Sequence, residues 1–195
     1  MRSTFISHLF RRYRTNSKMR RPWIAFFSQT GSEIVSIANA LGYWPDAIIT
    51  NDRPSNIRKI NNELQEQHLL ATIVNKPLVE DYEEVIGFYK DPIITLHGWL
   101  RIMPPSICEK YNIFNGHPGL ITLYPELKGK DPQVKAFELG HKTVGCVIHE
   151  VTAGVDEGKI LRSQAFVSKE KLDIDKIFLI LSNISTEMWV KFIKY

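Results

Sequence analysis

The sequence has few cysteines, no long apolar run and, over its first 21 residues, no acid. Cys108 and Cys146 are the two cysteines of a 195-residue chain, which excludes a disulfide framework and a metal cluster of the CxxC type. Apolar runs stay far below the ~18–20 residues that cross a bilayer. We therefore expect no metal, no membrane partner and a cytoplasmic location.

The positive charge of the chain is concentrated at its start. Residues 1–21 hold seven of the 25 lysines and arginines, whereas the remaining residues hold 18 basic against 21 acidic side chains. The formal charge of +4 therefore belongs to a basic N-terminal extension, residues 1–22, and the domain predicted over residues 23–195 is mildly acidic. Nucleic acid is accordingly not an expected partner of the domain.

Three interpretations of residues 1–22 are open. Arginine, serine and a small apolar cluster without acids are typical of an organelle transit peptide. A basic arm that touches nucleic acid is the second interpretation. The third is a non-essential extension upstream of Met19, which opens the segment MRRPWIAFF.

From residue 23 the sequence alternates short apolar runs with amphipathic stretches, which indicates βα units around a parallel sheet. We expect strands over 23–27, 47–50, 69–74 and 92–96, and helices over 32–41, 57–64, 78–89 and 104–110. Residues 113–114 are apolar, 115–131 are loop-like, and a helix over 132–139 precedes two strands (143–151 and 159–167) and a last helix over 172–192. The sequence thus predicts the α/β class: an open, mostly parallel, Rossmann-like sheet with flanking helices, whose loops form a ligand crevice.

The candidate chemistry begins directly after the apolar pair 113–114, in Asn115-Gly116-His117-Pro118-Gly119. An amide and an imidazole two residues apart on an extended segment point the same way. Asn115 can donate a hydrogen bond to a developing oxyanion, and His117 can act as general acid or base. The alternative is a solvated surface turn set by proline and glycine.

Asp156, in the turn Ala153–Gly158, is the second candidate. If the turn folds back beside His117, Asp156 can orient water or stabilise the imidazolium. The alternative is a turn carboxylate that bonds to its own backbone.

These segments together carry a family resemblance. The runs FNGHPGLITLYPELKG and AFELGHKTVGCVIHEVTAGVDEGKIL, the segment Leu96–Met103 and the loop Ser28–Ser32 resemble, in this order, the folate-dependent formyltransferases, and among them the glycinamide ribonucleotide formyltransferases. The resemblance covers about residues 23–167. It implies the formyltransferase fold and transfer of a formyl group from 10-formyltetrahydrofolate, as cosubstrate, to a primary amine.

The resemblance also implies residue roles. Asn115 steadies the oxyanion, His117 relays a proton, and Asp156 tunes His117 and anchors a water. The implied folate-binding residues are Leu100, Arg101, Ile102, Met103, Val151, Thr152 and Val155. The implied acceptor-binding residues are Gly31, Ser32, Glu33, Gly119 and Lys128. The expected partners are folate and a small amine acceptor, and the expected state is a monomer or homodimer.

Glu33 departs from the family pattern, which places a polar and typically Asn side chain where the acceptor phosphate binds. A carboxylate there repels phosphate. Thr30–Glu33 also predicts a capping box, in which Glu33 satisfies the amides of its own helix. Three readings stay open: Glu33 turns outward and the acceptor is glycinamide ribonucleotide, the acceptor is an amino sugar or another amine without a phosphate there, or the protein is a folate- or nucleotide-binding module without turnover. From the length we expect neither the additional domain of methionyl-tRNA formyltransferases nor that of the folate-hydrolysing relatives.

Overall fold

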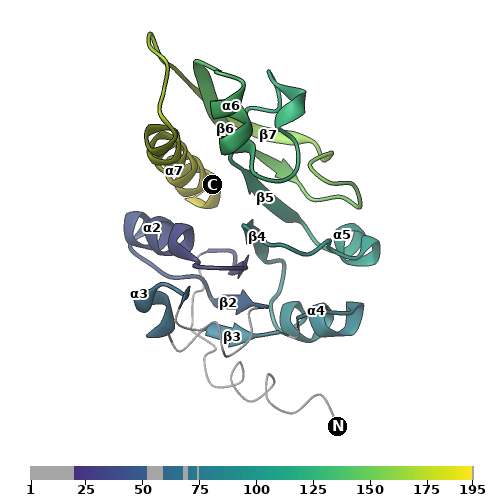
Figure 1. Cartoon of the computed structure of the whole chain (residues 1–195). Coiled ribbons are helices and arrows are strands. Elements are labelled where there is room, and N and C mark those ends of the chain that lie inside the picture. Colours follow the sequence, from purple (N-terminus) through teal and green to yellow (C-terminus); the bar gives the residue numbers. More distant parts are fainter. Residues whose placement is uncertain (1–19, 52–58, 68–69, 74, 195) are drawn as a thin grey trace. The chain divides into compact units, whose positions relative to one another are not determined.

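The computed structural model describes residues 20–51, 59–67, 70–73 and 75–194 of the chain. Two compact units divide it, Met1–Ile113 and Phe114–Tyr195 (Figure 1). Most of the predicted basic extension lies outside the described residues. Its last two arginines form ion pairs within the first unit, Arg20 with Asp46 at 2.7 Å and Arg21 with Asp91 at 2.9 Å. Arg20 and Arg21 are therefore bound to the first unit by ion pairs.

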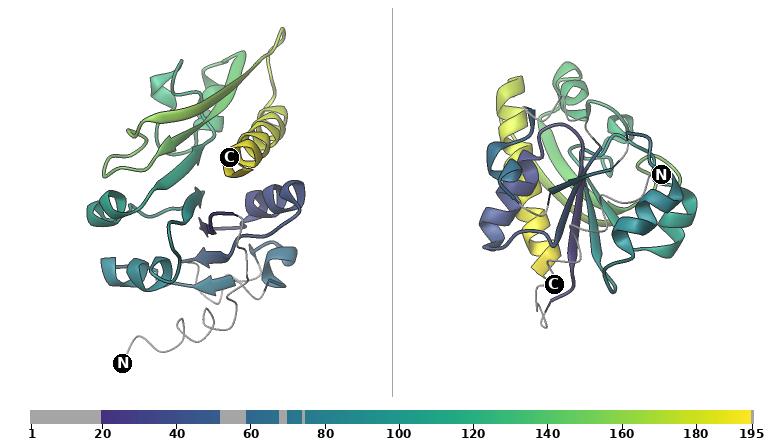
Figure 2. Two further views of the ribbon diagram at one scale, coloured as in Figure 1. Left: turned by 180° about the vertical axis from the view of Figure 1, so that it is seen from behind. Right: turned by 90° about the horizontal axis from the view of Figure 1, so that it is seen from below.

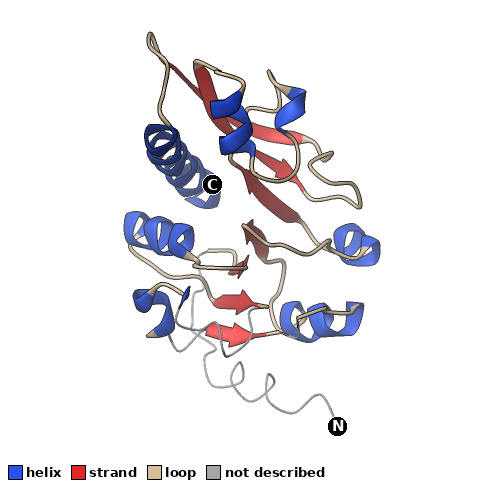
Figure 3. Ribbon diagram, viewed as in Figure 1, coloured by secondary structure: helices blue, strands red, loops and turns tan. Residues whose placement is uncertain are grey.

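The first unit is built on four parallel strands. β1 (Trp23–Phe27), β2 (Ala47–Thr50), β3 (Leu70–Thr72) and β4 (Ile93–His97) lie in the order β3-β2-β1-β4. Every residue of β1 and β4 is buried, as continuous apolar runs in a parallel sheet require. The helices α2 (Ser32–Leu41) and α3 (Asn62–Gln65) lie on one side of these strands, and α4 (Val79–Ile86) and α5 (Pro105–Lys110) lie on the other (Figures 1 and 3).

This arrangement creates a topological switch point. The chain proceeds from β1 to β2 and β3 on one side and then returns to place β4 on the other side of β1. In open α/β sheets, ligands bind outside the carboxyl ends of the two strands that flank such a point. The segments that follow β1 and β4 are therefore the two ligand-facing segments of the first unit.

Most predicted elements of the first unit are confirmed with small shifts of boundary. The helix predicted over 57–64 is an exception: α3 covers only Asn62–Gln65, because the side chain of Asn61 caps its start by accepting the backbone N–H of Glu63. β1, α2 and β2 have the predicted ends, and β4 begins and ends one residue later. α4 ends at Ile86 instead of Tyr89, because Gly87 follows and glycine is a poor helix former. Ile57, Leu69 and Val74 lie outside the described residues.

The second unit is built on antiparallel strands. β5 (Ile113–His117), β6 (Thr143–Glu150) and β7 (Ile160–Val167) pair in that order. The predicted strand pair around a glycine turn is thus confirmed as a hairpin, while the mostly parallel pattern describes the first unit. The connection from β5 to β6 holds the short helices η2 (Pro125–Leu127) and α6 (Pro132–Glu138). α7 (Ile174–Lys194) follows β7 (Figure 2). Within the described ranges, no helix has both the length and the apolar character that a bilayer span requires.

One predicted loop boundary is wrong. Residues 115–117, predicted as the start of a loop, continue β5, because each of them pairs with β6 across the ladder from His149 to Val147. Proline and glycine punctuation at Gly116 and Pro118 concealed this pairing. The consequence is that Asn115 and His117 occupy alternate positions of a regular strand and share one face of it.

The opposite face of these strands packs on α7. A side chain at Gly116 would lie 2.7 Å from the indole nitrogen of Trp189, and the thiol of Cys146 donates to the carbonyl of Leu181 at 3.4 Å. Because side chains alternate along a strand, this contact directs Asn115 and His117 away from α7.

Candidate active site

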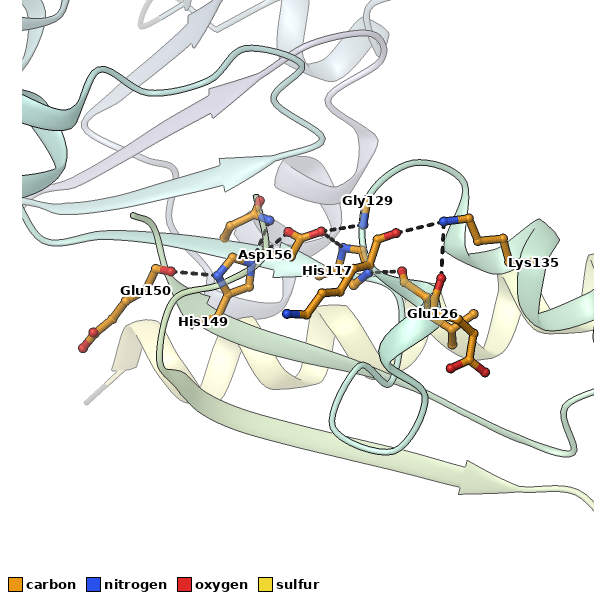
Figure 4. Close-up of polar contacts among 10 residues, drawn as sticks. His117, Glu126, Gly129, Lys135, His149, Glu150 and Asp156 are labelled. Carbon is orange, nitrogen blue, oxygen red and sulfur yellow. Dashed lines mark hydrogen bonds and ion pairs between the residues drawn. The ribbon is translucent and has the colours of Figure 1, made fainter. Parts of the chain in front are cut away.

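His117 and Asp156 form a buried contact in the second unit. Nδ1 of His117 lies 3.2 Å from Oδ2 of Asp156, and the two side chains are 5% and 8% exposed. The other ring nitrogen, Nε2, lies 2.8 Å from the carbonyl oxygen of Leu127 in η2 (Figure 4). Because a carbonyl oxygen only accepts, Nε2 of His117 carries a proton and Nδ1 is the nitrogen that titrates.

The turn between β6 and β7 holds Asp156 in place. Its φ angle is 53°, in the left-handed region that aspartate tolerates better than most residues. The backbone N–H of Gly129 donates to Oδ2 of Asp156 at 2.9 Å. The turn therefore folds back toward β5, as the functional interpretation of Asp156 requires, and does not leave the carboxylate to solvent.

Sequence reasoning missed a third member of this cluster, His149. Its Nε2 lies 3.3 Å from Oδ1 of Asp156 and 3.1 Å from Nδ2 of Asn115, and its Nδ1 lies 2.7 Å from the carbonyl oxygen of Glu150. Figure 4 shows Asp156 between the two imidazole rings. His149 could have been predicted from its pairing with Asn115 across the two strands. That pairing becomes visible only when β5 is extended to residue 117 and paired antiparallel with β6.

The electrostatics of the cluster favour an ionised aspartate and a neutral His117. Burial alone would raise the pKa of Asp156, but the hydrogen bond with His149, the charge of His117 and the Gly129 amide outweigh it and hold that pKa below 3.8. Burial lowers the pKa of His117 below 6.5, although Asp156 and the Leu127 carbonyl oppose this effect. A buried imidazole that is neutral near neutral pH can accept a proton from a reacting group.

Gly119 determines how closely the chain can approach His117. It is buried, and a Cβ atom there would lie 2.7 Å from Nε2 of His117 and 2.9 Å from Cβ of Pro132. Gly119 thus makes room for the imidazole beside the start of α6. Its contact with the acceptor stays a prediction.

A lysine holds the loop that carries Gly129. Nζ of Lys135 in α6 donates to the carbonyl of Lys128 at 2.8 Å (Figure 4). The side chain of Lys128 itself is exposed, as a residue that meets a ligand from solvent would be, and its acceptor contact stays a prediction. Lys135 therefore supports the loop whose amide binds Asp156.

The segment predicted to hold folate follows β4 in the first unit. The backbone N–H of Leu100 donates to Oγ of Ser28 at 3.1 Å, and the Ser28 hydroxyl donates to Asn51 at 2.7 Å. These bonds tie together the carboxyl ends of β1, β2 and β4. Leu100 and Ile102 are 57% and 71% exposed, so they offer apolar surface at the switch point, whereas Met103 is buried in the core.

Arg101 is engaged within the protein. Nε donates to the backbone carbonyl of Asn75 at 2.7 Å, Nη2 donates to its side chain, and Nη1 donates to the Leu100 carbonyl. These contacts give Arg101 a role in fixing the backbone of its segment. A direct bond from its guanidinium to a ligand stays a prediction.

The remaining predicted folate residues lie in the second unit, between β6 and Asp156. Val151 is half-buried, and Thr152 and Val155 are exposed. The side chain of Val155, adjacent to Asp156, is 58% exposed. A folate pocket that includes this segment stays a prediction.

Glu33 does not form the predicted capping box. The N-cap residue of α2 is Gly31, with φ 66°, so Glu33 is the second helical residue and not the third, which a reciprocal box requires. A Cβ atom at Gly31 would lie 2.8 Å from Leu64, which explains glycine there. Oε2 of Glu33 lies instead 2.7 Å from Nδ1 of His97 at the end of β4, and the side chain is 31% exposed. Glu33 thus does not turn freely outward.

The described residues contain no group of three or more His, Cys, Asp or Glu side chains arranged to hold a metal ion.

Comparison with known proteins places this geometry in context. Residues 75–177, more than half of the chain, match the sequence profile of the formyl transferase family. A segment of 83 residues is 35% identical to the human trifunctional purine biosynthetic protein adenosine-3, covering 42% of this chain and 8% of that protein. A longer segment of 150 residues is 25% identical to phosphoribosylglycinamide formyltransferase of Mycobacterium tuberculosis, covering 72% of this chain and 68% of that protein.

A solved structure shares the fold. Phosphoribosylglycinamide formyltransferase from Coxiella burnetii superposes with a TM-score of 0.74 at 20% identity, covering 90% of this chain and 86% of that one. This likeness confirms the predicted α/β formyltransferase fold. The profile match over more than half of its length shows that the chain belongs to the formyl transferase family.

Proposed function

We propose that the protein transfers the formyl group of 10-formyltetrahydrofolate to the primary amine of a small, nucleotide-like acceptor. The observation that carries this proposal is the buried contact of His117 with Asp156, at the end of a strand that also presents Asn115. Family membership supports formyl transfer as the type of reaction.

The chemistry requires one proton to leave and one to arrive. The amine nitrogen attacks the formyl carbon and a new C–N bond forms, which places negative charge on the formyl oxygen. The bond from that carbon to the folate nitrogen then breaks. The amine loses a proton and the folate nitrogen gains one, so a group that can hold a proton in between lowers both barriers. Nδ1 of His117, facing Asp156, is suited to that task.

Asn115 would stabilise the oxyanion. Its side-chain amide is an N–H donor on the same face of β5 as His117, so a reacting carbon can lie within reach of both. A preorganised donor of this kind contributes about 10²–10³-fold to the rate in other acyl transfers.

The default acceptor is glycinamide ribonucleotide. The name of the mycobacterial relative, with which 72% of this chain aligns, supports it. A second candidate, an amino sugar nucleotide or another amine that places no phosphate at the start of α2, is favoured by one observation: Glu33 puts a carboxylate in the first turn of that helix and pairs it with His97. An internal anion there competes with a bound phosphate.

An acceptor screen tests the proposal. The wild-type protein is incubated with 10-formyltetrahydrofolate and either glycinamide ribonucleotide or a panel of amino sugars and amino-sugar nucleotides, and release of tetrahydrofolate is followed. His117→Asn and Asp156→Asn should reduce turnover by at least about 10²-fold while retaining folate binding. Folate binding without turnover of any acceptor would identify a non-catalytic binding module instead.

A further inference from the structure

The two histidines of the cluster are each fixed at one ring nitrogen by a backbone carbonyl. Nε2 of His117 bonds to the carbonyl of Leu127, and Nδ1 of His149 bonds to the carbonyl of Glu150. Both of these nitrogens must carry a proton, because carbonyl oxygens only accept. The neutral forms of the two rings are therefore opposite tautomers, Nε2–H in His117 and Nδ1–H in His149.

The two remaining ring nitrogens face the two oxygens of one carboxylate. Nδ1 of His117 lies 3.2 Å from Oδ2 of Asp156, and Nε2 of His149 lies 3.3 Å from Oδ1. With both rings neutral and Asp156 ionised, two lone pairs would face a negative charge. A single additional proton, on either ring, converts one of these contacts into a charge-assisted hydrogen bond.

The nitrogen of His149 that faces Asp156 has a second partner. Nε2 lies 3.1 Å from Nδ2 of Asn115. It can accept the Asn115 N–H only while it is unprotonated, and it can donate to Asp156 only when it is protonated. The two partners therefore require opposite charge states of His149.

We propose that His149 is a positioning residue that couples the orientation of the Asn115 amide to the location of one proton shared between His117 and His149 across Asp156. When His117 holds the proton, neutral His149 accepts one N–H of Asn115 and thereby fixes the direction of the other. When His149 holds the proton, its N–H turns to Asp156 and Asn115 loses its anchor. The oriented oxyanion donor and the protonated general acid thus occur in the same state of the cluster.

The surrounding charges agree with this exchange. Two titratable groups interact with His149: Asp156 in the β6–β7 turn lies 3.3 Å from its Nε2, and His117 on β5 interacts with its charge. A positive charge on His149 lowers the pKa of His117, so the two rings disfavour simultaneous protonation. Lys135 on α6 also lowers the pKa of His117. The catalytic meaning of the coupling rests on the proposed formyl transfer, but the coupling itself does not.

The first test needs no substrate. Ring nitrogens of the histidines and the side-chain amide of Asn115 are followed by ¹⁵N NMR in the wild-type protein as the pH is lowered. We expect the Nδ1–H tautomer for neutral His149, the Nε2–H tautomer for neutral His117, and a shift of the Asn115 amide that accompanies any change at Nε2 of His149. A neutral His149 in the Nε2–H form, or an Asn115 signal that stays constant while the Nε2 signal of His149 changes, would overturn the proposal.

The second test compares two substitutions. His149→Gln retains an acceptor for Asn115 but cannot hold the proton, whereas His149→Phe removes both abilities. We expect His149→Phe to lower kcat by about 10–100-fold with little change in KM, as for other residues that orient a reacting group. The coupling also predicts that kcat of the wild type declines at acidic pH; His149→Gln should keep most of kcat at neutral pH and lose this decline.

A matched control is His141→Gln, which alters a histidine of the same unit that stacks on Tyr124 and pairs with Glu126. It should leave the pH profile unchanged. If kcat of His149→Gln declines at acidic pH as it does in the wild type, the coupling is contradicted. If the NMR coupling is present but no acceptor is turned over, the proposed function fails and the coupling stands; turnover without the coupling refutes the coupling alone.

Discussion

Oε2 of Glu33 lies 2.7 Å from Nδ1 of His97, and this contact joins the first turn of α2 to the end of β4. His97 is itself bonded through Nε2 to Oγ1 of Thr95 at 2.8 Å, and the indole N–H of Trp23 donates to the same Oγ1 at 2.8 Å. A carboxylate only accepts, so Nδ1 of His97 donates to Glu33. In the neutral ring Nε2 then accepts from the Thr95 hydroxyl, whose oxygen can accept the indole N–H at the same time. A directional series of hydrogen bonds therefore fixes a carboxylate beside the switch point.

Replacing His97 should cost stability because its ring is buried and bonds to the buried hydroxyl of Thr95. In His97→Leu, the Thr95 hydroxyl and the carboxylate of Glu33 each lose their hydrogen bond with the imidazole. We expect the free energy of unfolding to fall by about 1–3 kcal/mol, because two hydrogen bonds are lost and each contributes about 0.5–1.5 kcal/mol. Urea titration measures it. Glu33→Gln, which keeps an acceptor for His97, should change stability by less than about 1 kcal/mol, and equal losses in the two variants would contradict the series of bonds.

Glu33→Gln should also change which acceptor is preferred. Removing the charge leaves the positive end of the α2 dipole without its internal anion, so a phosphate can bind there more favourably. We expect the KM for glycinamide ribonucleotide to fall by about 3–10-fold, corresponding to roughly 0.6–1.4 kcal/mol of helix-terminus electrostatics. The KM for the corresponding acceptor without a phosphate should not change. If the ratio of the KM values of the two acceptors is the same in Glu33→Gln as in the wild type, Glu33 does not select against phosphate.

The fold could be predicted from the sequence wherever local pattern decides it. The buried runs of β1 and β2 and the periodic face of α2 produced correct boundaries. Asn115, His117 and Asp156 could be singled out because residue type and order were informative. His149 could not be singled out, because nothing in its own strand distinguishes it from the neighbouring residues until the partner strand and the register are known.

Long-range side-chain contacts were also not predicted from the sequence. The capping box at Thr30–Glu33 was a sound local expectation, and a tertiary contact with His97 took the carboxylate instead. Helix-capping rules describe a helix alone, whereas Glu33 lies beside a strand that follows it by more than fifty residues in the chain. The local sequence pattern therefore singled out Glu33 but did not predict its contact with His97.

The buried state of His117 should make the stability of the protein depend on pH. Its pKa in the folded protein is below 6.5, so the unfolded chain binds a proton more readily than the folded one. The free energy of unfolding should therefore decrease as the pH falls from about 6.5 to the folded pKa of His117, and then level off. Thermal unfolding between pH 7.5 and pH 5 measures this slope. His117→Gln, which has no titrating ring, should show a smaller slope, and an unchanged slope would mean that other groups produce it.

Gly119→Ala tests how tightly the chain is fitted to the His117 ring. The new Cβ would lie 2.7 Å from Nε2 of His117 and 2.9 Å from Cβ of Pro132, so the ring must move away from the Leu127 carbonyl. We expect formyl transfer to fall by at least about tenfold, because a displacement of the order of 1 Å at a catalytic group is costly. The matched control is Gly140→Ala, which has open space around it but a φ of 69°. It should lose about 1 kcal/mol of stability and retain activity. If Gly119→Ala loses stability like the control and keeps full turnover, then the position of the His117 ring is not what limits the reaction.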